Sequence, residues 1–361
     1  MNRVKPEMRR VILAKDKLGE LIGRWAAERD AIAPVRREAV EFETVRSADE
    51  IALDYRNTRS PAKRLFFQPC EALLRFDFKA APDRQVAEAT GEIRPVVLFA
   101  VRPCEARSLT LLDHVFLGKD YRDPYYARRR EATVVVVMGC TIAGPTCFCT
   151  SVGGAPNDHA GADLFLSDCG DAFVVDLVTE RGAALLAGFD FPEADAQLLG
   201  QVEQWAERAA AEMPTVADVE QIVRRAAGAF DDPCWQAFCE MCLGCAACSF
   251  LCPTCHCFDI QDEVAGSTGR RIRNYDTCAF PNFTLHASGH NPRPERLQRC
   301  RHRILHKLSY FPANFGQIAC VGCGRCIRVC PAGNDMRRWL RTLNEVCSRT
   351  GCQPVLRRGI T

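Results

Sequence analysis

The run Cys242-Leu-Gly-Cys245-Ala-Ala-Cys248-Ser-Phe-Leu-Cys252-Pro253 has the same spacing as Cys320-Val-Gly-Cys323-Gly-Arg-Cys326-Ile-Arg-Val-Cys330-Pro331. Each reads C-x2-C-x2-C-x3-C-P, the spacing with which bacterial ferredoxins bind [4Fe–4S] clusters. Closely spaced thiolates in a tight loop can hold one face of a cubane, and the fourth follows on the next element. The proline after it has no backbone N–H, so no competing donor stands there. The two runs predict two [4Fe–4S] clusters.

The fourth cysteine of each run decides how the clusters are shared. In two-cluster ferredoxins this cysteine ligates the cluster of the other run. One cluster is then held by Cys242, Cys245, Cys248 and Cys330, and the second by Cys320, Cys323, Cys326 and Cys252. This exchange makes both runs one folding unit with adjacent clusters, an arrangement suited to the transfer of single electrons.

A zinc site or buried free thiols are the alternatives for these cysteines. Zinc sites usually combine two C-x2-C knuckles across a long gap. A third cysteine at the same spacing and a fourth before proline do not belong to that pattern, and here both occur twice. The spacing therefore favours iron–sulfur ligation.

Composition sets the class of protein. The chain has 361 residues, 22 cysteines and a net charge of +2, which gives no sign of a nucleic-acid or membrane-surface partner. Residues 1–30 are charged throughout and lack the apolar core of a signal peptide. The longest apolar run, 134–138, is too short to cross a bilayer. We expect a cytoplasmic protein without membrane insertion, whose reduced thiols are available to iron.

An α/β domain is expected over residues 1–214, with Pro214 near its end. The unbroken apolar runs 95–101 and 133–138 predict buried strands. Further strands are expected at 41–45, 64–67, 164–166 and 173–178, and helices at 17–29, 105–116, 180–186, 193–212 and 216–230.

The dicluster domain is expected over residues 215–361. The long insertion between the two runs favours a mostly helical, α-helical ferredoxin-like module over the compact β-hairpin form. A short helix is expected at 233–241, another through the basic segment near 297–308, and a last helix capped by Asp335.

Four further cysteines form a candidate third site. Cys104 and Cys140 each follow a predicted buried strand, at the sheet edge where open α/β proteins bind ligands. Cys147 and Cys149 lie in the loop after the second of these strands. Four converging thiolates would bind a third iron–sulfur cluster. The alternative is that some of them are buried structural thiols.

The remaining candidates are weaker. Cys255, His256 and Cys257 follow the first run, where they either tune a cluster or simply pack. The other cysteines show no ligand spacing, and we expect them to be inert or hydrogen-bond neighbours: Cys70, Cys169, Cys234, Cys239, Cys278, Cys300, Cys347 and Cys352. Neither a dinucleotide-binding fingerprint nor a P-loop occurs, so partners are needed at both ends of an electron relay.

A basic segment lies within the insertion, and it consists of Arg293, Arg296, Arg299, Arg301, Arg303 and Lys307. It is either a solvated helix face or a source of positive charge for the negatively charged clusters. Arg325 and Arg328 fit the second role better, because they lie inside the second run. Nucleic-acid binding is the least favoured interpretation, since few aromatic residues are interleaved.

Six strings together resemble a known family: Arg102-Pro-Cys-Glu105, Asp123-Pro-Tyr-Tyr126 followed by Arg128 to Arg130, Thr146-Cys-Phe-Cys-Thr-Ser151, Cys252-Pro-Thr-Cys-His-Cys-Phe258, Gly289-His-Asn-Pro-Arg293 and Cys320-Val-Gly-Cys-Gly-Arg-Cys326. The combination resembles the beta subunits of cytoplasmic sulfhydrogenases, which are tetrameric nickel–iron hydrogenases. It is also similar to the dicluster electron-transfer component of anaerobic sulfite reductase. The likeness extends from about Arg94 to Pro331.

The resemblance implies an iron–sulfur subunit without bond chemistry of its own. Such a subunit passes electrons between an FAD- and NAD(P)H-binding, diaphorase-type subunit and a catalytic subunit, either a nickel–iron hydrogenase or a sirohaem sulfite reductase. Two rivals remain. One is a self-contained redox enzyme whose active site is the pocket of Cys104, Cys140, Cys147 and Cys149. The other is a nucleic-acid-binding iron–sulfur protein.

Overall fold

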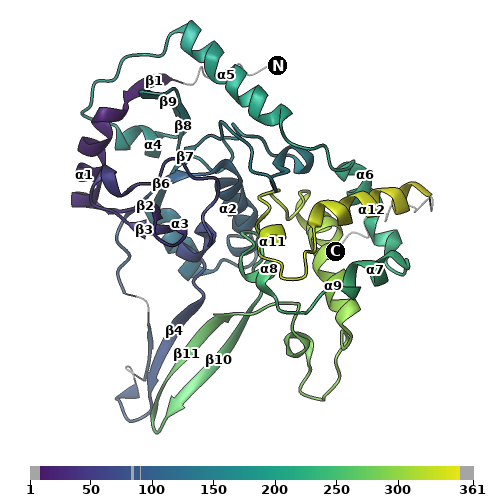
Figure 1. Cartoon of the computed structure of the whole chain (residues 1–361). Coiled ribbons are helices and arrows are strands. Elements are labelled where there is room, and N and C mark those ends of the chain that lie inside the picture. Colours follow the sequence, from purple (N-terminus) through teal and green to yellow (C-terminus); the bar gives the residue numbers. More distant parts are fainter. Residues whose placement is uncertain (1–8, 83–84, 90, 350–361) are drawn as a thin grey trace.

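The structure is a computed structural model that describes residues 9–82, 85–89 and 91–349. In Figure 1 a central sheet flanked by helices forms the main body, and a second sheet extends from it as an arm. The helices of the C-terminal third lie on the opposite flank of the body from α1. Among the described residues, no helix combines the length and the apolar character needed to cross a membrane. The cytoplasmic location stays a prediction.

The central sheet has seven described strands in the order β1-β9-β8-β7-β6-β2-β3. The inner strands β2, β6, β7 and β8 run parallel, and β1, β9 and β3 pair antiparallel with their neighbours. The prediction of an α/β N-terminal region is confirmed. The strands are β1 Arg10–Ala14, β2 Asp30–Arg36, β3 Val40–Thr44, β6 Val96–Val101, β7 Thr133–Met138, β8 Leu164–Asp168 and β9 Ala172–Leu177.

Helices cover both faces of this sheet because its parallel strands are apolar on both sides. Val97 and Val134 face the core that contains α1 (Leu18–Glu28) and α4 (Glu180–Leu185). Leu98 and Val135, one position further along each strand, face the core that contains α2 (Pro103–Phe116) and α3 (Pro124–Ala132). The result is a three-layer α/β/α arrangement, with Cys104 at the start of α2 and Cys140 just after β7, both following the ends of neighbouring parallel strands.

The strand expected at 64–67 is wrong. The chain forms a 3-10 turn at Ala62–Leu65, and the Phe67 N–H donates to the Lys63 carbonyl at 2.8 Å. Phe66 and Phe67 are both fully buried. Strand residues alternate between two faces, so one turn of helix buries two consecutive aromatic rings on the same side more readily.

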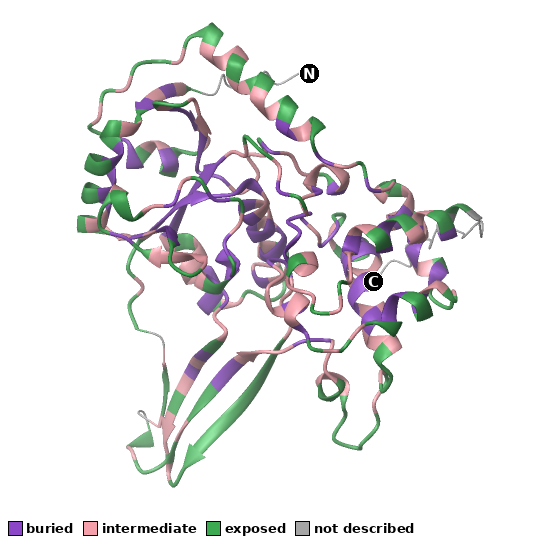
Figure 2. Cartoon of the chain, viewed as in Figure 1, coloured by how far each residue is buried: buried purple, intermediate pink, exposed green. Residues whose placement is uncertain are grey.

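The arm is an antiparallel sheet in the order β10-β11-β4-β5. Its strands are β4 Cys70–Asp77, β5 Val86–Glu88, β10 Phe258–Ala265 and β11 Thr268–Tyr275. Figure 2 shows β10 as exposed along its length. Since β4 pairs with β11, segments from both sides of the expected boundary near Pro214 share one sheet. That boundary stays a prediction.

Short helices surround the two cysteine runs and pack around Trp235, Ile304 and Leu340. The hairpin β10–β11 nevertheless lies between the runs, so the expectation of a mostly helical dicluster domain is not confirmed. The remaining α-helices are α5 Ala196–Ala211, which is not part of this core, α6 Val219–Arg225, α7 Cys234–Glu240, α8 Ala247–Phe250, α9 Arg296–Leu305, α10 Phe311–Phe315, α11 Arg325–Arg328 and α12 Met336–Arg349. A π-helical turn, His306–Tyr310, continues α9.

Candidate iron–sulfur sites

The two cysteine runs fold in the same way. In each, the residues on either side of the second cysteine have positive φ: Gly244 and Ala246 in the first run, Gly322 and Gly324 in the second. A short helix then begins, α8 or α11, and carries the third cysteine. The left-handed residues turn the chain tightly enough for consecutive thiols to point toward one centre. This conformation is why glycine suits three of the four positions.

The first run and the end of the second run line one cavity. Its volume is about 730 Å³, open mouth included, and its lining contains Cys242, Cys245, Cys248 and Cys330. The structure thus brings together all four residues expected at the first cluster. The backbone N–H of Asn334 donates to Cys330 Sγ at 3.3 Å. Such an N–H···S contact orients a ligand thiolate and stabilises its negative charge.

The second run lies around the last cysteine of the first. Cys252 is close enough to Cys320, Cys323 and Cys326 for its charge to act on all three, and burial is the main cause of the raised pKa of each of these thiols. Cys330 lines the first cavity, as Cys326 of the same run also does, and Cys252 lies near the second run, while the exchange of ligands stays a prediction.

Two buried cations lie between the cysteines of both runs. Lys307 Nζ donates to Cys252 Sγ at 3.4 Å and to Thr254 Oγ1 at 2.9 Å. Arg303 Nη2 donates to the Cys248 carbonyl at 3.1 Å. Both side chains come from the basic segment, so part of that segment is not a solvated face.

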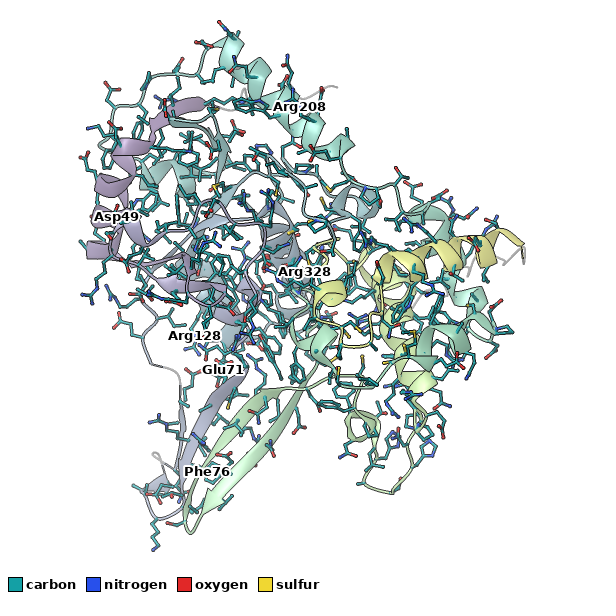
Figure 3. All side chains as sticks on the ribbon, viewed as in Figure 1. Asp49, Glu71, Phe76, Arg128, Arg208 and Arg328 are labelled. Carbon is teal, nitrogen blue, oxygen red and sulfur yellow. The ribbon has the colours of Figure 1, made fainter. Side chains whose placement is uncertain are left out.

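Arg325 and Arg328, the cations that the sequence favoured, have other partners. Arg325 forms a buried ion pair with Glu105 of α2. Arg328, labelled in Figure 3, donates to Thr146 Oγ1 at 3.1 Å. These contacts join the second run to the α/β region, and the positive charge of Arg325 also acts on the Cys323 and Cys104 thiols, where it lowers the pKa of each against the effect of burial.

The candidate third site is also assembled. Cys104, Cys140, Cys147 and Cys149 line one cavity of about 530 Å³. They come from α2, from the residues just after β7 and from the loop that follows. Arg102 lies at the same cavity and donates to the Gly139 carbonyl at 2.8 Å, which places a cation near the Cys140 thiol.

The third site is interlocked with the second run. Cys323 lines the same cavity, and Asn57 Nδ2 donates to its carbonyl oxygen at 3.1 Å. The Phe148 N–H donates to the Gly322 carbonyl at 2.9 Å. A Cβ at Gly322 would lie 2.5 Å from Cys149 Cα, so glycine is required for this approach. The loop of the third site and the loop of the second run are thus in backbone contact.

The thiols of the third site are poor nucleophiles as free cysteines. Burial raises the pKa of Cys104 well above its usual value, raises that of Cys140, and raises that of Cys149 to about 12. A reactive cysteine needs the opposite shift, because the thiolate is the nucleophile. Iron, in contrast, binds thiolates directly and displaces their protons.

A further group of thiols lies next to the first run. Cys278, expected to be inert or a hydrogen-bond neighbour, shares a hydrogen bond with the Cys257 thiol, and Cys255 shares one with Cys252. Cys300 lines the first cavity beside Cys242. The side chain of Cys347 and all of Cys352 lie outside the described residues.

Within the described part of the chain, no group of three or more histidine, cysteine, aspartate or glutamate side chains is arranged to hold a single metal ion. A [4Fe–4S] cluster is bound in a different way from a single metal ion, because each of its irons takes one protein thiolate. Cysteines that are spread around a cavity can bind such a cluster, and the first and third cavities are lined in this way.

Comparison with known proteins agrees with this interpretation of the cysteine runs. Residues 241–334 match the family described as 4Fe–4S dicluster domain. The chain is also 34% identical, over 331 residues, to sulfhydrogenase 2 subunit beta of Pyrococcus furiosus, an alignment that covers 90% of this chain and 95% of the relative. The chain therefore belongs to the sulfhydrogenase beta-subunit family and carries a 4Fe–4S dicluster domain.

Proposed function

We propose that this protein is the iron–sulfur electron-transfer subunit of a hydrogenase-type oxidoreductase complex. It passes single electrons between an FAD- and NAD(P)H-binding, diaphorase-type subunit and a catalytic subunit. A nickel–iron hydrogenase is the first choice for the catalytic subunit, because the relative is a sulfhydrogenase subunit. A sirohaem sulfite reductase is the second. The complex is expected to be cytoplasmic.

The exchange of the fourth cysteines carries this proposal. Cys330 lines the cavity of Cys242, Cys245 and Cys248, and Cys252 lies beside the second run. We call the four cysteines assigned to the first cluster the first cage, and those assigned to the second cluster the second cage. Because each cage takes one cysteine from the other run, the two cages lie side by side. [4Fe–4S] clusters in such cages supply one-electron redox chemistry at short range.

The residues around the cages suit that role. Cys320, Cys323 and Cys326 come from a loop packed against the α/β region, and their burial keeps water away from the sulfur atoms. The Lys307 ammonium donates to Cys252 Sγ, and the Asn334 N–H donates to Cys330 Sγ. Hydrogen bonds and exposure at the thiolates are the means by which proteins set cluster potentials.

We further propose that Cys104, Cys140, Cys147 and Cys149 hold a third iron–sulfur cluster. Convergence of the four thiols on one cavity beside Arg102 supports it. Because Cys323 lines that cavity too, the third site is adjacent to the second cage. The order along the protein is then third site, second cage, first cage. A reconstituted chain should contain about twelve irons, whereas an iron content of about eight would show that no third cluster is bound.

Serine substitutions test the ligand exchange. Cys242→Ser and Cys330→Ser should alter the same cluster and leave the same residual electron paramagnetic resonance spectrum in the reduced protein. Cys252→Ser and Cys320→Ser should alter the other. Cys70→Ser, at an exposed position on the arm, is the matched control. If Cys330→Ser instead spares the cluster of Cys242 and removes that of Cys320, the exchange is wrong.

The rival interpretation, a self-contained enzyme at the third site, is disfavoured by the protonated state of its free thiols. It predicts that the isolated chain turns over a substrate without partner subunits. The relay predicts electron transfer only between added donors and acceptors, together with co-purification of a flavin-containing subunit.

A further inference from the structure

A group of thiols at the base of the arm takes no part in the three proposed cages. Cys257 and Cys278 line a cavity of about 360 Å³ together with Cys255 and Lys307. Both cysteines are free thiols in the structure, and their side chains share a hydrogen bond. Cys278 is buried, and Cys257 is half-buried.

The hairpin holds these two thiols together. Phe258 of β10 pairs with Tyr275 of β11, and the ladder continues one residue further, where the Asp276 N–H donates to the Cys257 carbonyl at 3.1 Å. Cys278 follows two residues later and turns back toward Cys257, whose sulfur also accepts the Cys278 backbone N–H. The register places Asp276, not Cys278, opposite Cys257, so the turn after β11 is what brings the Cys278 side chain back to the cavity that both cysteines line.

The pair is also next to the second cage. Cys255 precedes Cys257 by two residues and shares a hydrogen bond with Cys252, the residue assigned to the second cluster. Lys307, which donates to Cys252, lines the same cavity as the pair. One layer of side chains therefore separates the two thiols from the proposed electron path.

We propose that Cys257 and Cys278 form a redox-active dithiol–disulfide couple, a two-electron site beside the second cage. The inference rests on the proposed function, because its electron donors and acceptors are the iron–sulfur clusters. On oxidation the two sulfurs form one S–S bond, two electrons leave to two one-electron clusters, and the thiol protons are released. Reduction by two such clusters takes up two electrons and two protons and breaks the bond.

The surroundings favour this chemistry over a purely structural role. The hydrogen bond from Cys278 lowers the pKa of Cys257 to about 7, while the same bond raises that of Cys278. One sulfur therefore loses its proton more readily than the other, as the attacking thiolate of a thiol–disulfide pair must. The couple would join one-electron carriers to the two-electron chemistry of a flavin or nicotinamide partner.

Differential alkylation of the cluster-loaded chain tests the couple. The protein is poised anaerobically in glutathione buffers of graded potential and quenched in acid. It is then labelled with N-ethylmaleimide, reduced, and labelled again with iodoacetamide. Acid releases cluster ligands as free thiols, so only disulfide cysteines take the second label. As the buffer potential is raised, the fraction of Cys257 and of Cys278 that carries the second label should rise from nearly zero to nearly one. The two fractions should rise together, along a two-electron Nernst curve.

Matched variants separate the outcomes. Cys257→Ser and Cys278→Ser should each abolish the second label on the partner cysteine, keep wild-type iron content, and accept two fewer electrons in a reductive titration. Cys70→Ser should behave as wild type in all three measurements. The proposal is overturned if both cysteines take the first label at every potential, or if either variant loses iron, which would make the pair cluster ligands. Wild-type iron content reports on the proposed function separately.

Discussion

The sharpest prediction concerns Lys307, the buried cation that donates to Cys252 Sγ at 3.4 Å. Replacing it with methionine removes the charge and leaves an unbranched apolar side chain that is one heavy atom shorter. The Ala319 carbonyl, which also accepts from Lys307, keeps the Thr254 hydroxyl as a donor at 2.7 Å. The substitution therefore removes a charge without leaving this buried carbonyl unpaired.

The size of the effect follows from Coulomb's law. Reduction adds one negative charge, spread over the second cluster. With a charge separation of ~6 Å and an effective dielectric constant of ~20, the lysine stabilises the reduced state by about 3 kcal/mol. For a one-electron couple, ~1.4 kcal/mol corresponds to ~59 mV, so Lys307→Met should lower the potential of the second cluster by about 120 mV. Water entering the site would reduce the shift to about half.

Potentiometric titration followed by electron paramagnetic resonance measures both clusters in one sample. The second cluster should shift by the full amount, and the first by clearly less because it lies further from Lys307. Lys119→Met, an exposed lysine, is the charge-matched control and should move neither potential. An unchanged or raised potential of the second cluster, at wild-type iron content, would refute the role assigned to Lys307.

Three further predictions use other parts of the structure. Gly322→Ala places a Cβ 2.5 Å from Cys149 Cα, so it should cost the chain about four irons, whereas Gly289→Ala, with the same sign of φ and open space around it, should retain them. Glu105→Ala leaves a buried arginine unpaired and should lower the free energy of unfolding by about 3–5 kcal/mol in urea titrations, and a loss below ~1 kcal/mol would contradict the buried ion pair. Burial lowers the pKa of His256 from 6.5 to about 4, so the unfolded chain binds the proton first and stability falls as the pH drops below 6.5. Between pH 7 and 5.5 the wild type should lose about 1 kcal/mol more than His256→Gln, measured as the anaerobic urea midpoint, and equal losses would contradict the shift.

Local spacing made strands β3, β6, β7, β8 and β9 of the central sheet predictable, together with the grouping of cysteines at the first and third cavities, whereas β1 and β2 were not predicted. An unbroken apolar run specifies a buried strand, and the cysteines that follow β6 and β7 come to one edge because parallel strands end there. The arm could not be predicted in this way. The pairing of β4 with β11 joins residues nearly two hundred positions apart, and neither strand contains a signal for the other. The contact between Cys257 and Cys278 depends on the register of the hairpin, so the spacing of these two cysteines in the sequence was uninformative.

The two cysteine runs show what identical spacing leaves undecided. Ala246 and Gly324 occupy the same position of the repeat and share a positive φ, so the loop conformation is set locally. Their surroundings differ. A Cβ at Gly322 would lie 2.5 Å from Cys149 Cα, whereas a Cβ at Gly244, the same position of the first run, would meet nothing within 4 Å. The second run therefore docks closely on the α/β region, and the first run, whose Cys245 is exposed, has open space at the corresponding position. In the proposed relay this asymmetry distinguishes the two ends of the path, since the second cage adjoins the third site and the first cage includes the exposed Cys245.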